Sequence, residues 1–396
     1  MDRAALAARN QELVQKLRQP SLKHHLRNAL LRLIAKAPLP PQRADSNRLL
    51  IIRPDHLGDM LLTTPAIKAI KTQRPQLSIH VLCGDWCADA LAHFEEIDQV
   101  LTLPFPGFQR GGSAGGNPYR LALQSARKLR QVGYDSAIIM RPDHWWGALL
   151  AYLAGIRQRV GYSEPGVVPF LTDARALQNE HVVEQNWRLA EAYVELPLPC
   201  EIRLEFRLQN SDSRRIDSLL ADRGIDAGKP IVCIHPGSGA SSKLWLAEKW
   251  AAVADAISRE YDEEIVFSGT AGDTAMIEDI AAIMSAAPHH LAGSTSVGEL
   301  AALYRRASLV MGPDSGAMHV AASVNCPTVA LFGPADPTEF APWGDPGRHA
   351  VIASDIACGP CRILDWRGDK PDFHPCVRDI SVERVLGEAR RVLEDG

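Results

Sequence analysis

The chain has 396 residues, of which 46% are hydrophobic and 23% charged, a composition that excludes a disordered or fibrous protein. Its length predicts two or three domains, each large enough to bury its own core. The net charge of −4 excludes the overall positive field of many nucleic-acid-binding proteins. With neither a signal peptide nor an apolar stretch of the roughly 18–20 residues that span a bilayer, we expect a cytoplasmic protein that does not bind nucleic acid.

Residues 1–47 are predicted to form a basic helical extension that ends in a proline-rich linker at 37–41. Leucines recur at helical spacing among many lysines and arginines, whereas the only acids before the linker are Asp2 and Glu12. Two interpretations fit this pattern. Residues 1–36 form either an amphipathic helix in peripheral contact with the anionic inner membrane or a helix packed on the protein body.

The first domain is predicted over residues 48–205. It begins with an apolar strand at 48–53, a glycine-containing turn and a helix at 60–72. Further strands are predicted at 76–82, 100–103 and 135–140, and further helices at 120–131 and 146–154. Strands that alternate with helices predict a parallel sheet covered by helices on both faces.

A second strand, glycine-rich turn and helix follow about 180 residues later, in a domain predicted at 206–380. Its predicted strands are 230–235, 264–268, 309–311 and 328–332, and its helices are 246–261, 273–285, 297–307 and 316–324. A last helix within 381–396 is expected to cross back to the first domain. The fold class is therefore α/β, with two Rossmann-like domains facing a central cleft. Ligands of such sheets bind beyond the carboxyl ends of the strands.

The turn after the first strand carries two carboxylates, Asp55 and Asp59, on either side of His56. A carboxylate at the mouth of a cleft can act as the general base for a hydroxyl nucleophile. The simpler interpretation is a helix cap, because acids are common at the start of a helix.

The turn at 235–245 offers small residues, among them Ser238 and Gly239, and then Lys243. Backbone N–H groups of such a turn can cradle a phosphate. The turn lacks the ending of a Walker A loop, and Ser242 stands where a dinucleotide fingerprint needs its third glycine, so an NAD-dependent oxidoreductase is disfavoured. Lys243 at the start of a helix would be unfavourable beside the helix dipole unless an anion compensates for it.

The turn at 312–319 places Asp314 and Ser315 where either can cap a helix that starts at Gly316. The free N–H groups of that helix can hold an anion, and His319, one turn later, can contact the same ligand. Capping alone does not explain His319. A further segment at 332–337 is mainly a turn signal.

In combination these segments resemble the family 9 glycosyltransferases, the ADP-heptose:lipopolysaccharide heptosyltransferases. The matching segments, in the family's order and spacing, are RPDHLGDMLLTTPA (53–66), HPGSG and KLW (235–245), GPDSGAMH (312–319) and LFGPADP (331–337). The resemblance covers about residues 48–395. It implies the GT-B fold, an inverting transfer without a catalytic cofactor or metal, an ADP-heptose donor, and a glycan, lipid-linked or other hydroxyl acceptor such as the lipopolysaccharide core.

The resemblance also implies roles for single residues, and Asp59 matches the family's proposed catalytic base. The residues that match donor-binding positions are Ser238, Gly239 and Lys243 for the diphosphate, Asp314, Ser315, Gly316 and His319 for the donor motif, and Asp273 and Thr295 near the nucleoside. Two alternatives share the fold: a transferase that moves a different nucleotide-linked sugar to a glycoside or protein, and a non-catalytic protein that binds a nucleotide sugar. The intact set of matching residues argues against the second.

A cysteine-rich loop lies at 358–376 in the second domain. Cys358, Cys361, Cys376 and His374 are ligand types suited to zinc or iron. Some members of the family carry a similar loop. The expectation is a structural metal ion that braces the loop, with reduced thiols or a single disulfide as the alternatives.

Overall fold

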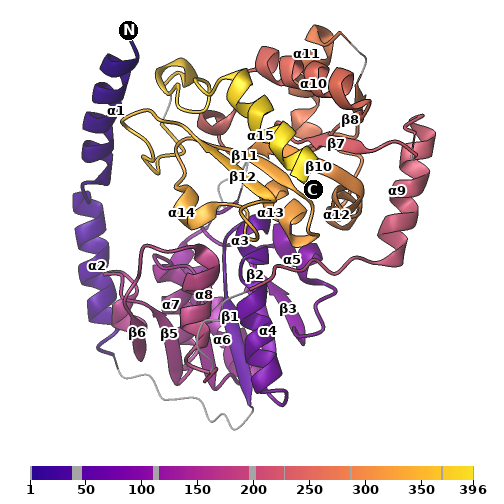
Figure 1. Ribbon diagram of the computed structural model, residues 1–396. Coiled ribbons are helices and arrows are strands. Elements are labelled where there is room, and N and C mark those ends of the chain that lie inside the picture. The colour runs from indigo at the N-terminus through magenta and orange to yellow at the C-terminus, as the bar shows by residue number, and fades with distance from the viewer. Residues whose placement is uncertain are drawn as a thin grey trace. The chain divides into compact units, whose positions relative to one another are not determined.

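The computed structural model describes residues 2–37, 47–109, 116–195, 202–226, 228–285, 288–366 and 369–395 (Figure 1). The chain divides into two compact units, Gln19–Ile202 and Met1–Arg18 with Arg203–Gly396. We call them the N-unit and the C-unit. Most of the proline-rich linker predicted at 37–41 lies outside the described residues.

Each unit is built on a six-stranded parallel sheet. The strand order is β3-β2-β1-β4-β5-β6 in the N-unit and β12-β11-β10-β7-β8-β9 in the C-unit. The N-unit strands are β1 Arg48–Ile52, β2 Ser78–Cys83, β3 Gln99–Thr102, β4 Ser136–Ile139, β5 Gln158–Tyr162 and β6 Asp173–Arg175. The C-unit strands are β7 Ile231–Ile234, β8 Glu264–Phe267, β9 His289–His290, β10 Ala307–Pro313, β11 Thr328–Phe332 and β12 His349–Ala353.

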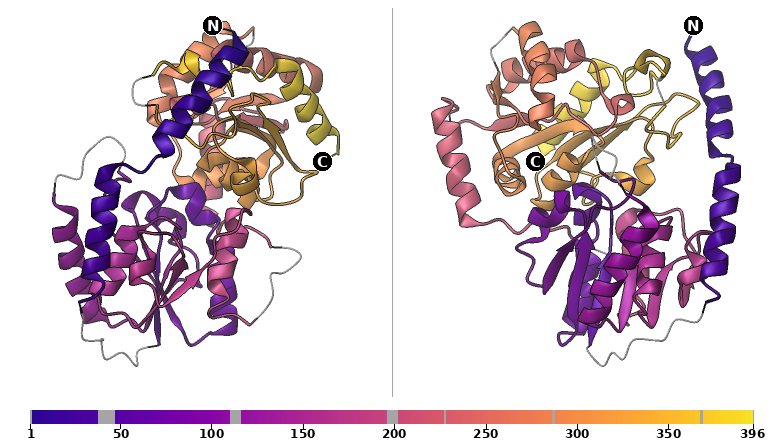
Figure 2. Two further views of the ribbon diagram at one scale, coloured as in Figure 1. Left: turned by 90° about the vertical axis from the view of Figure 1, so that its left-hand side faces the viewer. Right: turned by 180° about the vertical axis from the view of Figure 1, so that it is seen from behind.

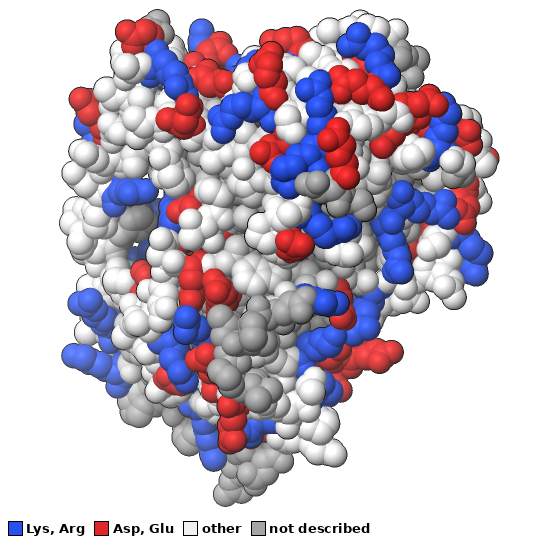
Figure 3. All heavy atoms as spheres, viewed as in Figure 1, with Lys and Arg blue, Asp and Glu red and all other residues white. Residues whose placement is uncertain are grey.

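Helices connect the strands and cover both faces of each sheet in the views of Figures 1 and 2. In the N-unit they are α2 Leu22–Ile34, α3 Leu57–Leu61, α4 Thr64–Gln73, α5 Asp85–Leu91, α6 Pro118–Val132, α7 Trp145–Leu153 and α8 Val182–Ala190. In the C-unit they are α1 Arg3–Arg18, α9 Asn210–Asp222, α10 Ala247–Tyr261, α11 Thr274–Ile283, α12 Val297–Arg306, α13 Gly316–Ser323, α14 Pro337–Phe340 and α15 Val382–Asp395. Short 3₁₀ helices are η1 Val168–Phe170, η2 Ser241–Lys243, η3 Ala271–Asp273 and η4 Pro371–Phe373. Acidic and basic side chains are interspersed over the face shown in Figure 3.

The central strand β1 shows why the N-unit folds as a covered sheet. Its side chains alternate between the two faces, so that Leu49 and Ile51 enter one buried cluster and Leu50 and Ile52 enter the other. All four are fully buried. A strand buried on both faces therefore reads as a continuous apolar run, as it does in this sequence.

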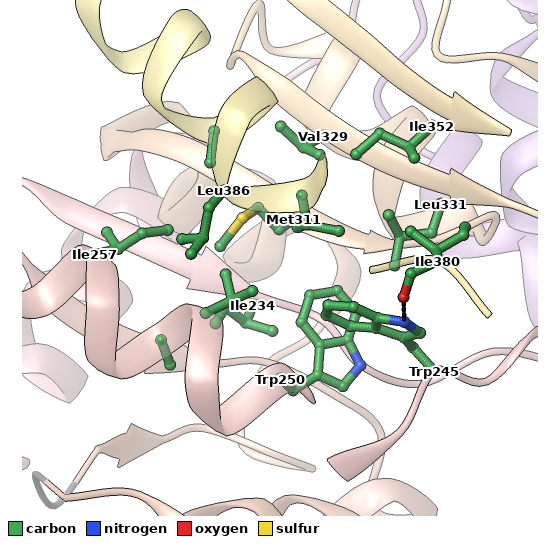
Figure 4. Packing of buried hydrophobic residues seen from close by; sticks show 14 of the residues in the cluster. Ile234, Trp245, Trp250, Ile257, Met311, Val329, Leu331, Ile352, Ile380 and Leu386 are labelled. Carbon is green, nitrogen blue, oxygen red and sulfur yellow. Dashed lines mark hydrogen bonds between the residues drawn. The ribbon is translucent and has the colours of Figure 1, made fainter. Parts of the chain in front are cut away.

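The core of the C-unit surrounds two tryptophans (Figure 4). Trp245 and Trp250 meet edge to face, with ring centroids 4.8 Å apart. Trp245 Nε1 donates a hydrogen bond of 3.0 Å to the backbone oxygen of Ile380, which precedes α15. Leu386 and Ala389 of α15 belong to the same cluster, so the last helix completes the core of the C-unit.

The predicted fold class, two parallel α/β sheets with an N-terminal helical extension, is confirmed. The helix predicted at 60–72 is instead two helices, α3 and α4, because Pro65 at the start of α4 cannot continue a preceding helix. Several short or half-exposed elements were not predicted, namely α5, α8, α9, α14, β5, β6, β9 and β12.

The N-terminal extension, predicted as one segment, is divided between the units. In α1, Asn10 donates a hydrogen bond of 2.8 Å to the backbone oxygen of Phe373, and Leu6 and Val14 are buried. In α2, Leu31 is buried against the N-unit. Both helices therefore pack on the body of the protein. Within the described ranges, no helix is long and apolar enough to cross a membrane.

Candidate active site

Asp59, the predicted base, lies on the short helix α3 shortly after β1. Its Oδ1 is 3.5 Å from Nη2 of Arg53, whose side chain is only 4% exposed. The Asp59 side chain is 29% exposed. The carboxylate therefore lies next to a buried cation and keeps part of its surface exposed.

Asp55, the other carboxylate of this turn, is engaged by two arginines. Its Oδ2 lies 2.9 Å from Nε of Arg53, an ion pair without hydrogen-bond alignment, and its Oδ1 accepts a hydrogen bond from Arg141. Burial by itself raises the pKa of Asp55, but the two guanidinium groups outweigh it and hold the pKa below its ordinary value. Asp55 is thus a buried structural anion, and Asp59 is the more exposed carboxylate of this turn.

Asn186, on α8, belongs to the same network and was not identified from the sequence. Its Oδ1 accepts a hydrogen bond of 2.9 Å from Nη1 of Arg53. Its Nδ2 donates to the backbone oxygen of Leu62 at 2.9 Å. The amide therefore ties the buried guanidinium to the end of α3, which carries Asp59. A single asparagine in a distant helix gives no local signal of such a contact.

The end of β4 adds Arg141 and His144 to this edge of the sheet. Arg141 forms an ion pair with Asp143 and lies over the ring of Phe108, 5.2 Å from its centroid. His144 packs against Phe105, and burial lowers its pKa to about 4, so that its ring is neutral. Together with Arg53 and its partners, these side chains form the polar carboxyl edge of the N-unit's sheet.

The C-unit brings three of the predicted donor-binding residues together. Lys243 Nζ lies 2.5 Å from Asp314 Oδ2, and Ser238 Oγ donates a hydrogen bond of 3.1 Å to the backbone oxygen of Asp314. The side chains of Lys243 and Asp314 are 15% and 9% exposed. The turns meet because they follow β7 and β10, which are neighbours in the sheet. Asp314 is thus the anion that compensates for Lys243 in this structure.

The local structure differs from the prediction at two points. Lys243 ends η2, and α10 begins only at Ala247, so the lysine is not in the first turn of a helix and the dipole argument does not apply to it. Ser315 precedes α13, but its side chain makes no capping hydrogen bond. Among the described residues, Met318 N–H donates to the backbone oxygen of Ser315 at 3.2 Å, whereas the N–H groups of Gly316 and Ala317 have no acceptor and can donate to an anion.

His319 lies one turn into α13 and is 5% exposed. Burial lowers its pKa to about 4, while Asp314 raises the pKa and Lys243 lowers it. Its Nδ1 is buried and has no hydrogen-bond partner among the described residues. A neutral imidazole with an unused nitrogen near Asp314 is suited to a hydrogen bond with a ligand.

Asp273 lies against the turn that follows β7. Its carboxylate is so close that a Cβ at Gly237 would lie 2.5 Å from Asp273 Oδ1. Thr295 lies two residues after Gly293, whose N–H donates a hydrogen bond of 2.9 Å to the backbone oxygen of Gly269. The segment of Thr295 therefore runs beside the segment that carries Asp273.

A pocket of about 430 Å³ lies beside the predicted diphosphate turn. It is lined by residues 239–242, among them Gly239, and by residues 364–366, Asp369 and His374. The His374 ring stacks on Trp366, with centroids 3.9 Å apart. The cysteine-rich loop thus forms one wall of a pocket next to the predicted diphosphate turn.

The three cysteines of that loop, together with His374, line one cavity of about 10 Å³, close to the volume that one water molecule needs. Cys358, Cys361 and Cys376 are free thiols, and burial raises the pKa of Cys376 to about 12. His374 Nε2 is 3.0 Å from Asp369 Oδ2. In the part of the chain that the structure describes, no three His, Cys, Asp or Glu side chains are arranged to hold a metal ion.

Known proteins resemble the chain in sequence and in fold. The family described as glycosyltransferase family 9 (heptosyltransferase) matches residues 122–365. Lipopolysaccharide heptosyltransferase 2 of Salmonella typhimurium is 28% identical over 362 residues, which cover 88% of this chain and 99% of that relative. A glycosyl transferase family 9 structure from Veillonella parvula has a TM-score of 0.74 at 22% identity, with 90% of this chain and 100% of that chain covered. The structure of Escherichia coli ADP-heptose lps heptosyltransferase II has a TM-score of 0.68 at 24% identity, with 88% and 99% covered.

The two solved structures show that the fold of the chain is that of heptosyltransferases, the GT-B type that the sequence predicts. The family match extends over more than half of the chain. The chain therefore belongs to glycosyltransferase family 9, the heptosyltransferase family.

Proposed function

We propose that the protein transfers a heptose from ADP-heptose to a hydroxyl of a lipopolysaccharide-core-like or other glycan acceptor, with inversion at the anomeric carbon. Family membership and the activities named for its relatives support the sugar and the donor. One observation carries the proposal: Ser238, Lys243 and the open N-terminus of α13 lie together at the carboxyl edge of the C-unit's sheet. A hydroxyl, an ammonium and free N–H groups in one place are suited to bind a diphosphate.

The leaving group is ADP, whose diphosphate gains negative charge as the bond to the sugar breaks. In the proposed complex the Lys243 ammonium pairs with the diphosphate, and the first N–H groups of α13 donate to its oxygens. His319 hydrogen-bonds the donor through its unused nitrogen, and Asp273 and Thr295 contact the nucleoside. Lys243 and Ser238 both contact Asp314, which supports a site that is already ordered before the donor binds.

Asp59 is the proposed general base. It takes the proton from the acceptor hydroxyl while that oxygen forms a bond to the anomeric carbon, on the side opposite to the departing ADP. Its partly exposed carboxylate supports this role, whereas the carboxylate of Asp55 is buried between two arginines. On the leaving-group side Lys243 supplies the positive charge, so the reaction as proposed uses no catalytic metal ion.

A donor screen tests the proposal. Purified protein is given ADP-heptose, other ADP-linked sugars, UDP-sugars and GDP-sugars, with a heptose-deficient lipopolysaccharide core as the acceptor. We expect transfer from ADP-heptose, and a product whose anomeric configuration is inverted when measured by NMR. Transfer from a different nucleotide sugar alone would refute the donor, and a retained configuration would refute the mechanism.

We also propose that the loop at 358–376 binds a structural zinc or iron ion. Its donor set fits such an ion in type, because three sulfurs and an imidazole suit zinc or iron and all four residues line one cavity. The four side chains would have to move closer together to complete a tetrahedron, since they are not arranged around a metal ion in this structure. Binding requires the thiols to lose their protons. Elemental analysis of protein purified without chelator should find metal in the wild type and less in Cys361→Ser. Metal-free wild-type protein would refute the site.

We place the reaction in the cytoplasm, at the face of the inner membrane where a lipid-linked acceptor is anchored. The basic residues of α2, with no acid in that helix, support peripheral contact of the extension with anionic lipid. Cell fractionation should recover part of the protein with the inner membrane, in a form that high salt releases. Protein that stays entirely outside the membrane fraction at low salt would contradict this location.

A further inference from the structure

The outward face of α2 carries a row of leucines. They are Leu22, Leu26, Leu30 and Leu33, which are 75%, 63%, 45% and 64% exposed. At about 100° per residue these positions fall within roughly 80° of one another around the helix axis, and Leu31 falls on the opposite side. Leu31 is fully buried against the N-unit. The helix is therefore apolar on two faces, and the N-unit covers one of them.

This row differs from the single apolar side chains that ordinary protein surfaces expose. Leu123, for comparison, is 50% exposed and is the one large hydrophobic residue exposed on α6 within the described residues. Four leucines along one helix face present a continuous apolar strip to water. The hydrophobic effect favours covering such a strip.

The chain around the leucine row is strongly basic. Between Glu12 and Asp45 it contains seven Lys and Arg residues and no acid. Lys23 and Arg32 fall on the two flanks of the leucine row. Lys and Arg side chains stand out along α2, at the left edge of Figure 3. An apolar helix face with a basic surround is typical of segments that lie on anionic lipid headgroups.

The neighbouring helix α1 does not share this property, because the C-unit uses its side chains. Arg3 and Arg9 form ion pairs with carboxylates of the C-unit, and Arg18 donates a hydrogen bond to a backbone oxygen there. The apolar residues Leu6 and Val14 are buried. Of the two helices of the extension, α2 is therefore the one whose row of leucines remains uncovered.

We propose that α2 docks the protein on an anionic bilayer, with the leucine row in the headgroup region and Lys23 and Arg32 beside the lipid phosphates. The proposal deepens the proposed function and depends on it for the choice of partner, since a lipid-linked acceptor is held at the same surface. Docking would keep the enzyme at that surface between successive transfers.

The test uses the full-length protein and sedimentation with vesicles. At low salt the wild type should sediment with vesicles that contain phosphatidylglycerol, should not sediment with phosphatidylcholine alone, and should be released by added salt. The double variant Leu22→Glu/Leu26→Glu should lower the bound fraction at least about tenfold, because it places charge in the apolar strip. Leu123→Glu, an exposed leucine outside α2, is the matched control and should bind as the wild type does.

Wild-type protein that stays in the supernatant with anionic vesicles would overturn the proposal, and so would equal binding by the double variant. A concentration-dependent mass increase that the double variant loses, with vesicle binding unchanged, would show instead that the leucine row joins two copies. Transfer to a short, water-soluble acceptor separates this inference from the proposed function. The wild type and the double variant should turn over equally there, and no transfer by either would refute the function but not the docking.

Discussion

Replacing Asp314 with asparagine tests how the donor site is arranged before ADP binds. The Asp314 carboxylate is 2.5 Å from the Lys243 ammonium, so it already forms an ion pair with the cation that the proposed diphosphate needs. A bound ADP must displace this partner or share it. Asp314→Asn keeps the shape of the side chain and removes its charge. We therefore expect ADP to bind the variant more tightly than the wild type.

The magnitude follows from the position of the charge. Two unit charges about 5 Å apart interact by roughly 3 kcal/mol at an effective dielectric constant of about 20. The two side chains are 9% and 15% exposed, so solvent screens the repulsion between Asp314 and a phosphate only in part. We expect a gain of about 1–2 kcal/mol, which lowers the Kd of ADP by roughly 5–30-fold.

Titration calorimetry with ADP measures the effect, and Lys243→Met is the opposite control, in which ADP should bind more weakly. Asp314→Asn leaves the mostly buried ammonium of Lys243 without its partner. The Tm of the variant should therefore lie below that of the wild type and should recover in saturating ADP. An ADP affinity equal to or below that of the wild type, in a variant that still melts cooperatively, would refute the competition between Asp314 and ADP.

Three further predictions concern the N-unit and the buried histidines. Asp59→Asn should lower kcat by about 10²–10⁴-fold in steady-state assays while calorimetry finds ADP binding unchanged, and turnover within a few-fold of the wild type would remove Asp59 from the base role. Asn186→Leu should lower kcat about tenfold, because Arg53 loses an acceptor and its hold on Asp59 loosens; an unchanged kcat would limit Asn186 to a structural role. The free energy of unfolding, measured in urea, should be highest above pH 6.5 and should fall as the pH drops from 6.5 to about 4. Burial lowers the folded-state pKa of four histidines to about 4, whereas the same histidines in the unfolded chain already bind protons below pH 6.5. A free energy that does not change over this range would contradict the prediction. The histidines are His144, His235, His319 and His349.

The elements that position the site were predictable because their signals are local. The strands β1 and β7 consist almost entirely of apolar residues and are followed by glycine-containing turns, which is the local signal that predicted them. Parallel neighbours then place the turns after β7 and β10 at one edge, which accounts for the meeting of Ser238, Lys243 and Asp314.

Other features could not be predicted because they depend on contacts between distant segments. The role of Asn186 exists only because α8 packs beside α3 and α4. Lys243 has its charge compensated by Asp314, 71 residues later, rather than by a bound anion alone. The basic residues of α1 looked like a membrane-binding set until their partners in the C-unit were known, since a charge pattern does not show what it pairs with.

The C-unit is completed by both ends of the chain, and this affects how the protein is made. Asn10 and its partner Phe373 are 363 residues apart, so α1 leaves the ribosome long before the residues that cover it exist. The entropic cost of closing a loop rises only slowly with the length of the loop. The main consequence of the long separation is therefore a delay before α1 can pack. The N-unit lies within one continuous segment and can fold during that interval. A chain that stops before residue 369 would lack partners of Arg3, Arg9 and Asn10 on α1, and a helix left without its cover exposes apolar surface that marks incomplete chains for chaperones and proteases.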